Sequence, residues 1–248
     1  MQLQNKVVIV TGGGSGFGEG MARRFDEEGA NVVIADIDKK NGERVAAEMS
    51  SPFFVETDVS SNESVAALVS KTVAEFGCLD VLINNAGMPQ RRGPMTDVDE
   101  ATFDRIFAVN VKSIFLTCKH AVPELQKTRS GVILNTASTA AKSPRPGLTW
   151  YNGSKGAVLT LTKSMALELA PKNIRVNAIN PVIGETGMTR EFLGGEDIPA
   201  LREKFIETIP LGRMSTPIDI ANAALFLCSE EASLITGVCL EVDGGRCI

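Results

Sequence analysis

Residues 149–158 read TWYNGSKGAV and contain the only tyrosine of the 248-residue chain, Tyr151, followed one helical turn later by Lys155. Because residues i and i+4 share one face of a helix, the phenol and the ammonium are expected to point into one site. A free phenol has a pKa of about 10 and is a poor base at neutral pH. A neighbouring ammonium, or an oxidised nicotinamide, favours the phenolate and lowers that pKa. The pair therefore predicts a general acid/base that takes the proton of an alcohol while hydride leaves its carbon.

Two further polar residues could complete such a site. Ser138 follows the apolar run GVILNTA, and a hydroxyl at that strand end could hydrogen-bond the reacting oxygen and support the phenolate. Asn110 lies in a long expected helix, where asparagine is a mediocre interior residue, so we expect it to have a purpose, for example holding a water near Lys155. A Tyr-x-x-x-Lys spacing alone also occurs by chance as a surface pair. The combination with the motifs that follow favours a site.

The glycine-rich run TGGGSGFG (11–18) follows the first apolar segment, with Gly12, Gly16 and Gly18 as its skeleton. Glycine permits a positive φ angle and lets backbone N–H groups approach a pyrophosphate. The helix expected to start near Gly16 presents its N-terminal dipole to that anion. A plain glycine turn is the competing interpretation, since a glycine loop alone is a weak signal. Its position directly after the first strand favours a dinucleotide site.

Asp36 ends the second expected strand and bears on which dinucleotide is bound. An acid there can accept both ribose hydroxyls and repels a 2′-phosphate. Ile37 follows it where an arginine would favour a phosphate, so we predict NAD, with NADP less favoured; Lys39 and Lys40 keep that alternative open. The competing interpretation is that Asp36 caps the helix expected from Lys39.

Short β-branched runs alternate with helix-length segments along the whole chain. Strands are expected at 6–10, 31–35, 53–57, 80–84, 131–135, 174–179 and 238–242, and helices at 16–29, 39–49, 61–76, 100–127, 153–170 and 217–229. This alternation predicts an α/β fold, a doubly wound parallel sheet of seven strands with helices on both faces, in a single domain spanning 1–248. The stretch 181–200, rich in Gly, Thr and Glu, is expected to be irregular, as a lid or a disordered segment.

The composition excludes several classes of protein. With 25 basic and 30 acidic side chains the net charge is −5, which argues against a nucleic-acid or anionic-membrane binder. The five cysteines are scattered without a C-x-x-C pair and no signal peptide is expected before the first strand, so reduced thiols in the cytoplasm are predicted. No apolar run approaches the roughly 18 residues of a transmembrane helix. No His, Cys or carboxylate spacing suggests a metal site.

Taken in order, these motifs closely resemble those of the short-chain dehydrogenase/reductase family, in its compact single-domain branch with a Rossmann-type fold. The resemblance covers essentially the whole chain. TGGGSGFG matches the family's cofactor loop, NNAG (84–87) the segment after the fourth strand, Asp58 the acid that meets the adenine, and VDGG (242–245) the C-terminal strand end. The resemblance implies hydride transfer between a nicotinamide and an alcohol or carbonyl carbon. It also suggests a homotetramer, with the helices at 100–127 and 153–170 packed between subunits.

The resemblance further implies roles for individual residues. The catalytic tetrad would be Asn110, Ser138, Tyr151 and Lys155, with Lys155 also binding the nicotinamide ribose and Asn110 sustaining a proton relay. The residues expected to contact the cofactor are Gly12, Ser15, Gly16, Phe17, Gly18, Asp36, Ile37, Asp58, Val59, Asn85, Ala86, Gly87, Tyr151, Lys155, Pro181, Ile183 and Thr186.

Three positions depart from the family's pattern. Val182 stands where the family usually has a glycine after the sixth strand, which bears on the local backbone path. Thr186 keeps its expected spacing, so we still expect the Ile183 backbone and the Thr186 side chain to bind the carboxamide. Phe17 replaces a branched aliphatic residue in the cofactor loop and should be tolerated, whereas Gly153 is expected to loosen the first turn of the catalytic helix.

The substrate is expected above the carboxyl ends of the strands, within reach of segments 88–95, 139–150 and 184–200. These segments carry cations that could receive a carboxylate, phosphate or sulfonate: Arg91, Arg92, Lys142, Arg145 and Arg190. The competing interpretation is that each is a solvated loop charge. Trp150 either walls the pocket or packs under the loop, and His120, the only histidine, is expected to be structural.

The first functional hypothesis is an NAD-dependent oxidoreductase that interconverts a secondary alcohol and a ketone on a small polar or sugar-like molecule. A 3-oxoacyl-thioester (acyl carrier protein) reductase is a close alternative, but it would prefer NADPH in biosynthesis, against which Asp36 argues. A catalytically silent nucleotide-sensing protein of the same fold is the alternative from another class, and the intact Ser138, Tyr151 and Lys155 argue against it. A related sugar epimerase would need a longer chain.

Overall fold

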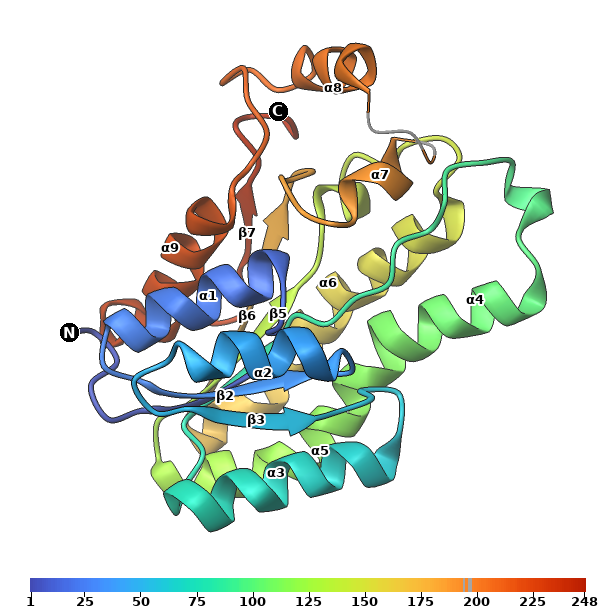
Figure 1. Ribbon diagram of the computed structural model, residues 1–248. Coiled ribbons are helices and arrows are strands. Elements are labelled where there is room, and N and C mark those ends of the chain that lie inside the picture. The colour runs from blue at the N-terminus through green and yellow to red at the C-terminus, as the bar shows by residue number, and fades with distance from the viewer. Residues whose placement is uncertain (194, 196–197) are drawn as a thin grey trace.

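The computed structural model, which describes residues 1–193, 195 and 198–248, is built around a parallel sheet (Figure 1). Within those residues seven strands follow the order β3-β2-β1-β4-β5-β6-β7, and every pairing is parallel. They are β1 (Val7–Thr11), β2 (Asn31–Asp36), β3 (Phe53–Glu56), β4 (Val81–Asn84), β5 (Gly131–Thr136), β6 (Ile174–Pro181) and β7 (Cys239–Val242). The order reverses between β1 and β4, so the predicted doubly wound α/β fold is confirmed.

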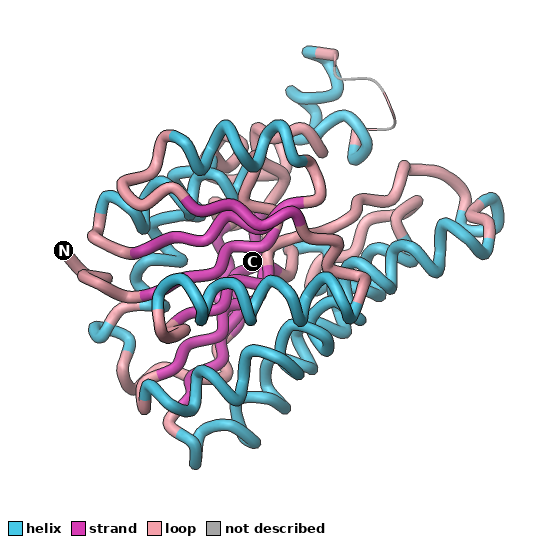
Figure 2. The backbone as a smooth tube through the Cα atoms, turned by 60° about the horizontal axis from the view of Figure 1, so that its bottom comes forward, coloured by secondary structure: helices cyan, strands magenta, loops and turns pink. Residues whose placement is uncertain are grey.

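Helices connect the strands and cover both faces of the sheet, as Figure 2 shows. The described α-helices are α1 (Gly16–Glu27), α2 (Lys39–Ala47), α3 (Asn62–Phe76), α4 (Glu100–Phe107), α5 (Ser113–Leu125), α6 (Thr149–Leu169), α7 (Thr189–Phe192), α8 (Pro199–Ile206) and α9 (Pro217–Cys228). Shorter turns are η1 (Met95–Asp97), η2 (Ala108–Lys112), η3 (Gln126–Thr128), η4 (Thr139–Ala141), η5 (Ala170–Lys172) and η6 (Glu230–Ala232). None of these helices is long and apolar enough to cross a membrane.

The core lies on both sides of the sheet because successive strand side chains point to opposite faces. Val8 packs in an apolar cluster that includes Phe25 of α1 and Ile220 of α9. Its neighbour Ile9 packs in a second cluster that includes Leu125 of α5. Strands buried on both faces read as continuous apolar runs, which is why they were visible in the sequence.

Three expected elements differ in the structure. The catalytic helix begins at Thr149 instead of 153, so Tyr151 lies within its first turn. The helix expected over 100–127 is interrupted by η2, a π-helical turn that contains Asn110. The stretch 181–200, expected to be irregular, contains α7 and the start of α8; its residues 194, 196 and 197 lie outside the described part.

Candidate active site

A cavity of about 450 Å³ lies along the carboxyl-terminal ends of the strands, where Gly12, Asp36, Asn85, Thr136 and Pro181 follow or end β1, β2, β4, β5 and β6. Sixteen of the seventeen residues expected to contact the cofactor line it: Gly12, Ser15, Gly16, Phe17, Asp36, Ile37, Asp58, Val59, Asn85, Ala86, Gly87, Tyr151, Lys155, Pro181, Ile183 and Thr186. Gly18 does not line the cavity. It packs so tightly that a Cβ there would lie 1.9 Å from the carbonyl oxygen of Gly12.

The glycine loop is held open by backbone conformation. Gly12 and Gly16 have φ angles of +65° and +54°, which residues that carry a side chain rarely adopt. A Cβ at Gly16 would also lie 3.2 Å from Cγ2 of Thr186, so the loop runs close to the segment that follows β6. Asn85 fastens the loop from the other side, because its Nδ2 donates to the carbonyl oxygens of Thr11 and Gly12 at 3.0 and 3.3 Å.

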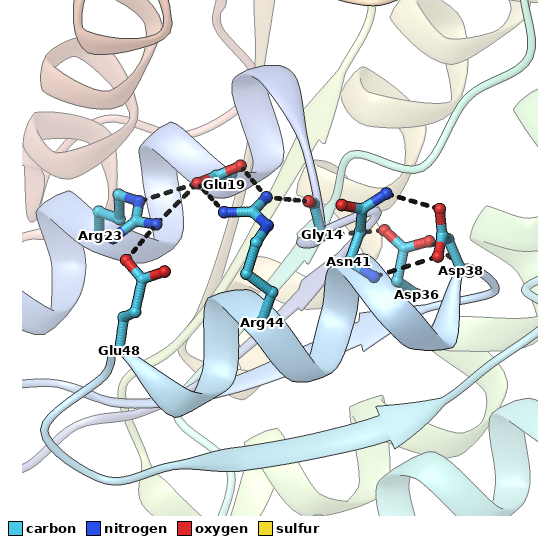
Figure 3. Close-up of polar contacts among 8 residues, drawn as sticks. All are labelled: Gly14, Glu19, Arg23, Asp36, Asp38, Asn41, Arg44 and Glu48. Atoms are coloured by element: carbon cyan, nitrogen blue, oxygen red, sulfur yellow. Dashed lines mark hydrogen bonds and ion pairs between the residues drawn. The ribbon is translucent and has the colours of Figure 1, made fainter.

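Asp36 is fixed by two backbone hydrogen bonds at the edge of this loop (Figure 3). Its Oδ2 accepts from the N–H of Gly14 and its Oδ1 from the N–H of Asp38, both at 2.9 Å. The cap of α2 is a different residue, Asp38, whose side chain accepts from the N–H of Asn41. Asp36 therefore does not cap the helix, which removes the competing interpretation of this residue.

A network of ion pairs ties the loop to α1 and α2 (Figure 3). Arg44 donates to both carboxylate oxygens of Glu19, at 3.0 and 2.8 Å, and to the carbonyl oxygen of Gly14 at 3.1 Å. Arg23 bridges Glu19 and Glu48, each at 2.8 Å. The hydrogen bond from Arg44 is the largest cause that holds the pKa of Glu19 below its ordinary value. The sequence analysis missed this network, although the i,i+4 spacing of Glu19 and Arg23 was a signal for part of it.

Tyr151 and Lys155 enter the cavity from the first two turns of α6. The Lys155 Nζ lies 6.0 Å from the centre of the Tyr151 ring and donates to the carbonyl oxygen of Thr136 at 2.8 Å. Burial raises the pKa of the Tyr151 phenol, while the Ser138 hydroxyl and the Arg145 charge lower it. Burial lowers the pKa of the Lys155 ammonium to about 8. The lowering of the phenol pKa by Lys155, which the sequence suggested, stays a prediction, and Arg145 is a further cation that lowers this pKa.

Asn110 lies in the π-helical turn and joins two segments of the site. Its Oδ1 accepts from the N–H of Met88 at 2.7 Å, and its Nδ2 donates to the Met88 carbonyl and to Ser154 Oγ, both at 3.0 Å. A small polar cavity of about 10 Å³, lined by Asn110, Thr117 and Lys155 among others, lies beside it. A cavity of that size is just large enough for one water. The role of Asn110 in holding a water stays a prediction, which this cavity supports.

Gln90 is a site residue that the sequence analysis did not find. Its side chain is 1% exposed, and its Oε1 accepts from the N–H groups of Trp150 and Tyr151, each at 3.0 Å. Its Nε2 donates to the carbonyl oxygen of Gly147 at 3.3 Å. The helix has no cap from its own N-cap residue, Leu148, so Gln90 satisfies two donors that α6 leaves without partners. No sequence signal marks a cap that comes from another loop.

A buried chain of hydrogen bonds links the strands β4 and β5 to the helices α5 and α6. Thr117 of α5 donates to Asn84 at 2.7 Å, Asn84 donates to Asn135 at 2.9 Å, and Asn135 donates to Thr162 of α6 at 2.9 Å. Every member is buried, and a fully satisfied polar chain in such surroundings fixes one arrangement of strands and helices. The helices α5 and α6 are thus tied to β4 and β5.

The departures from the family's pattern are accommodated. Val182 is 3% exposed, and its φ angle is not among the positive values of the described residues. Its N–H donates to the carbonyl oxygen of Val242 at 3.3 Å, so no glycine is needed there. The Phe17 ring lies against Gly184, where a Cβ would come within 2.4 Å of it. Gly153 lies inside α6, where a Cβ would meet nothing within 4 Å, and the helix continues through it.

At the substrate end, one of the five expected cations lines the cavity, Arg145. Lys142 forms an ion pair with Glu241, and the Arg190 guanidinium donates to the carbonyl oxygen of Gly195. Trp150 points away from the cavity: its indole donates to the Met95 carbonyl at 3.2 Å and its ring packs edge-on against Phe103. His120 Nε2 lies 3.0 Å from Asn62 Oδ1, which fits the structural role expected for it.

Comparisons with known proteins agree with this geometry. A family model described as enoyl-(acyl carrier protein) reductase matches residues 12–246. The 4-formylbenzenesulfonate dehydrogenase of Comamonas testosteroni is 46% identical and covers 99% of this chain and 99% of its own, and the meso-2,3-butanediol dehydrogenase of Serratia marcescens is 38% identical, with 99% and 96% covered. The crystal structure of a 3-ketoacyl-(acyl-carrier-protein) reductase from Brucella melitensis complexed with NADH aligns with a TM-score of 0.95 and 47% identity, over 99% of this chain and 100% of that one. The chain is similar to these proteins over its whole length.

Proposed function

The chain belongs to the short-chain dehydrogenase/reductase family, and we propose that it interconverts a secondary alcohol and a ketone with NAD, using Tyr151 as general acid/base. One observation carries the assignment of the base. The only tyrosine of the chain is 7% exposed, lines the large cavity, and meets the Ser138 hydroxyl there. A buried phenol beside a hydroxyl and two cations, facing a cavity at the carboxyl ends of a parallel sheet, is placed as a general acid/base requires.

The residues present fit a nicotinamide dinucleotide. The glycine loop offers backbone N–H groups at the start of α1, and Asp36 borders the cavity where an adenosine ribose would lie. Its carboxylate would accept from ribose hydroxyls and repel a 2′-phosphate. Arg44, the cation that could attract such a phosphate, is already paired with Glu19. NAD is the cofactor, and when bound it accepts or returns the hydride.

The chain's own groups manage the proton. In alcohol oxidation the Tyr151 phenolate oxygen takes the proton of the substrate hydroxyl, and in ketone reduction the phenol returns it. Ser138 positions the substrate oxygen by hydrogen bonding, since its own orientation is fixed by the N–H of Ala140 at 3.1 Å. In its protonated form Lys155 places a positive charge beside the Tyr151 ring, and the small polar cavity next to Asn110 supports a relay of the proton away from Tyr151.

The protein is further proposed to act as a homotetramer in the cytoplasm. The outer faces of α5 and α6 expose Phe115 at 61% and Leu167 at 82%, large apolar side chains that association would cover. All five cysteines are free, which supports a reducing compartment. Light scattering of the purified protein tests the assembly, and a monomer at micromolar concentration would contradict it.

The first experiment measures NADH formation at mildly alkaline pH against a panel of secondary alcohols, polyols and hydroxy acids, with NADP run in parallel. A 3-oxoacyl thioester with NADH or NADPH tests the close alternative. Tyr151→Phe is the matched variant: it should retain NADH binding while turnover falls by orders of magnitude. Wild-type turnover in that variant would remove Tyr151 from the mechanism. Binding of NADH without turnover on any substrate would favour the nucleotide-sensing alternative.

A further inference from the structure

Arginines from separate segments meet at the substrate end of the cavity. Arg145, in the loop before α6, lines the cavity beside Tyr151. Its guanidinium carbon lies 4.8 Å from the centre of the Phe205 ring and 5.8 Å from that of Phe192. The guanidinium carbon of Arg246, near the C-terminus, lies 5.4 Å from the centre of the same Phe205 ring. Two cations thus share one aromatic ring, although like charges repel each other.

Within the described residues, no carboxylate is paired with either of these two arginines. Burial and the charge of Arg246, with a smaller contribution from Arg92, lower the pKa of the Arg145 guanidinium to about 10. Partly buried guanidinium groups are normally paired with carboxylates or other anions. Arg145 is therefore a cation that faces a cavity and has no counter-ion among the residues that the structure describes.

The surroundings of Arg145 show what kind of anion would fit. The Phe192 ring lies 5.1 Å from the Tyr151 ring and lines the same cavity. Phe192 and Phe205 belong to an apolar cluster with Tyr151, Val182 and Leu148. The walls between the phenol and the guanidinium are thus aromatic and apolar. A ligand that fits both ends carries an apolar, flat body and an anionic head.

We propose that Arg145, with Arg246 behind it, is the receptor for a carboxylate or sulfonate group of the substrate, whose apolar body lies against Phe192. This inference rests on the proposed function, because the same substrate carries the hydroxyl group that meets Tyr151. The planar guanidinium presents two parallel N–H donors, a geometry that carboxylate and sulfonate oxygens match. The two aromatic rings hold the guanidinium in place before the anion arrives, so less side-chain entropy is lost on binding.

The test compares alcohols that differ only in charge. 4-(1-Hydroxyethyl)benzoate and 4-(1-hydroxyethyl)benzenesulfonate are the anionic probes, and 1-(4-nitrophenyl)ethanol is the neutral probe of similar shape. The measured quantity is the ratio of kcat/KM for each anion to kcat/KM for the neutral alcohol. Arg145→Met removes the charge and keeps an unbranched apolar stem. Lys142→Met is the matched control, because it removes one charge from the same loop at a residue that is paired with Glu241 and does not line the cavity.

We expect at least one of the two anions to be preferred by the wild type, and Arg145→Met to reduce that preference by roughly 10- to 100-fold, the range for a hydrogen bond to a charged group. Arg246→Met should reduce it less, and Lys142→Met should leave it unchanged. Because Arg145 also lowers the pKa of Tyr151, its loss slows all substrates, and the ratio removes that shared effect. An equal preference for the neutral alcohol, or a preference that survives in Arg145→Met, overturns the proposal.

A binding measurement separates this proposal from the proposed function. Calorimetric titration of 4-methylbenzenesulfonate and of neutral 4-nitrotoluene into the NAD-saturated protein needs no turnover. Tighter binding of the sulfonate by the wild type, lost in Arg145→Met but not in Lys142→Met, supports the anion site even if no alcohol in the panel is oxidised. Equal binding of the two compounds contradicts it even if alcohols are turned over. Thermal unfolding of each variant identifies any loss that comes from misfolding.

Discussion

The two ends of the cavity differ in whether their charged side chains form ion pairs. Beside the glycine loop four charged side chains are paired with one another, Glu19 with Arg44 and Arg23, and Arg23 with Glu48, and Asp36 is held by backbone N–H groups. At the substrate end Arg145 faces the cavity without an ion-pair partner in the described part of the chain. Charges that satisfy one another hold a shape, whereas an unpaired charge is free to hold a ligand. The cofactor end is therefore held in one shape by its own ion pairs, whereas the substrate end keeps a charged group available for a ligand.

The same contrast extends to the backbone. The cofactor end consists of strand ends, a glycine turn and the starts of helices, all braced by hydrogen bonds such as that from Asn85 to Thr11. The substrate end consists of the loop before α6 and the short helix α7, with Arg246 of the C-terminal segment behind them. Loops of this kind change without disturbing the sheet, so one scaffold can serve many substrates. Four substitutions test this difference between the two ends.

The largest effect is expected from Lys155→Met, because Lys155 lies between the cofactor end and the substrate end of the cavity. The variant loses the cation beside the Tyr151 phenolate and the donor to the Thr136 carbonyl. We expect kcat/KM for alcohol oxidation to fall by roughly 10²- to 10⁴-fold, the contribution of a tuned general base. Steady-state kinetics over a range of pH measures it. The control is Lys163→Met, since Lys163 is exposed on the same helix; similar losses in the two variants would show that helix charge alone matters.

A change at the cofactor end, Asp36→Ser, should alter which dinucleotide is used. The variant loses a carboxylate that would accept from ribose hydroxyls and repel a phosphate. We expect the ratio of kcat/KM with NAD to that with NADP to fall by roughly 10- to 100-fold, as expected for a charge-assisted hydrogen bond. Asp38→Ser removes the same charge two residues away but keeps a side chain that can cap α2, and it should preserve the ratio. A large change in that control would assign the preference to the general field of the turn.

Gln90→Leu tests the positioning of the base and should have a smaller effect. The variant leaves the N–H groups of Trp150 and Tyr151 without their acceptor. We expect kcat/KM to fall about tenfold, while the dissociation constant for NADH stays unchanged, because an unsatisfied buried donor costs about 1–3 kcal/mol. Gln90→Glu keeps the acceptor oxygen at the helix N-terminus but loses the donor to the Gly147 carbonyl, so it should restore turnover in part. Equal losses of stability and turnover in both variants would indicate a merely structural role.

Sequence reasoning identified the residues whose role depends on neighbours that are close in the sequence. The glycine loop, Asp36, and the pair Tyr151 and Lys155 each depend on neighbours within one strand, turn or helix, so their spacing, taken in combination, indicated them. The strands were found for the same reason, as apolar runs between turn residues. Their ends shifted by only a few positions in the structure.

What sequence reasoning missed depends on contacts between distant segments. The start of α6 was placed too late because its cap comes from Gln90 in another loop. The π-helical turn was missed because Asn110 bonds Met88 and Ser154, which lie far away in sequence. Among the loop cations, only the folded chain shows that Lys142 is paired and that Arg145 lacks an ion-pair partner among the described residues. Periodicity and propensity carry no information on such long-range partners.

The smallest effect is expected from Glu19→Gln, which opens the network at the cofactor end. The variant loses its charge-assisted bonds to Arg44 and Arg23, and partly exposed pairs of this kind contribute about 0.2–1 kcal/mol each. Arg44 chiefly holds the pKa of Glu19 below its ordinary value of 4.5, so the contribution to stability is present above that value and is lost as the pH falls through the lowered pKa. Urea unfolding should therefore separate wild type and variant at neutral pH and bring them together in acid. Glu27→Gln, outside the network, should show a smaller difference.

Since Arg44 is also released, affinity for NADP should rise slightly in Glu19→Gln; unchanged affinity would show that the network braces the loop without screening a phosphate.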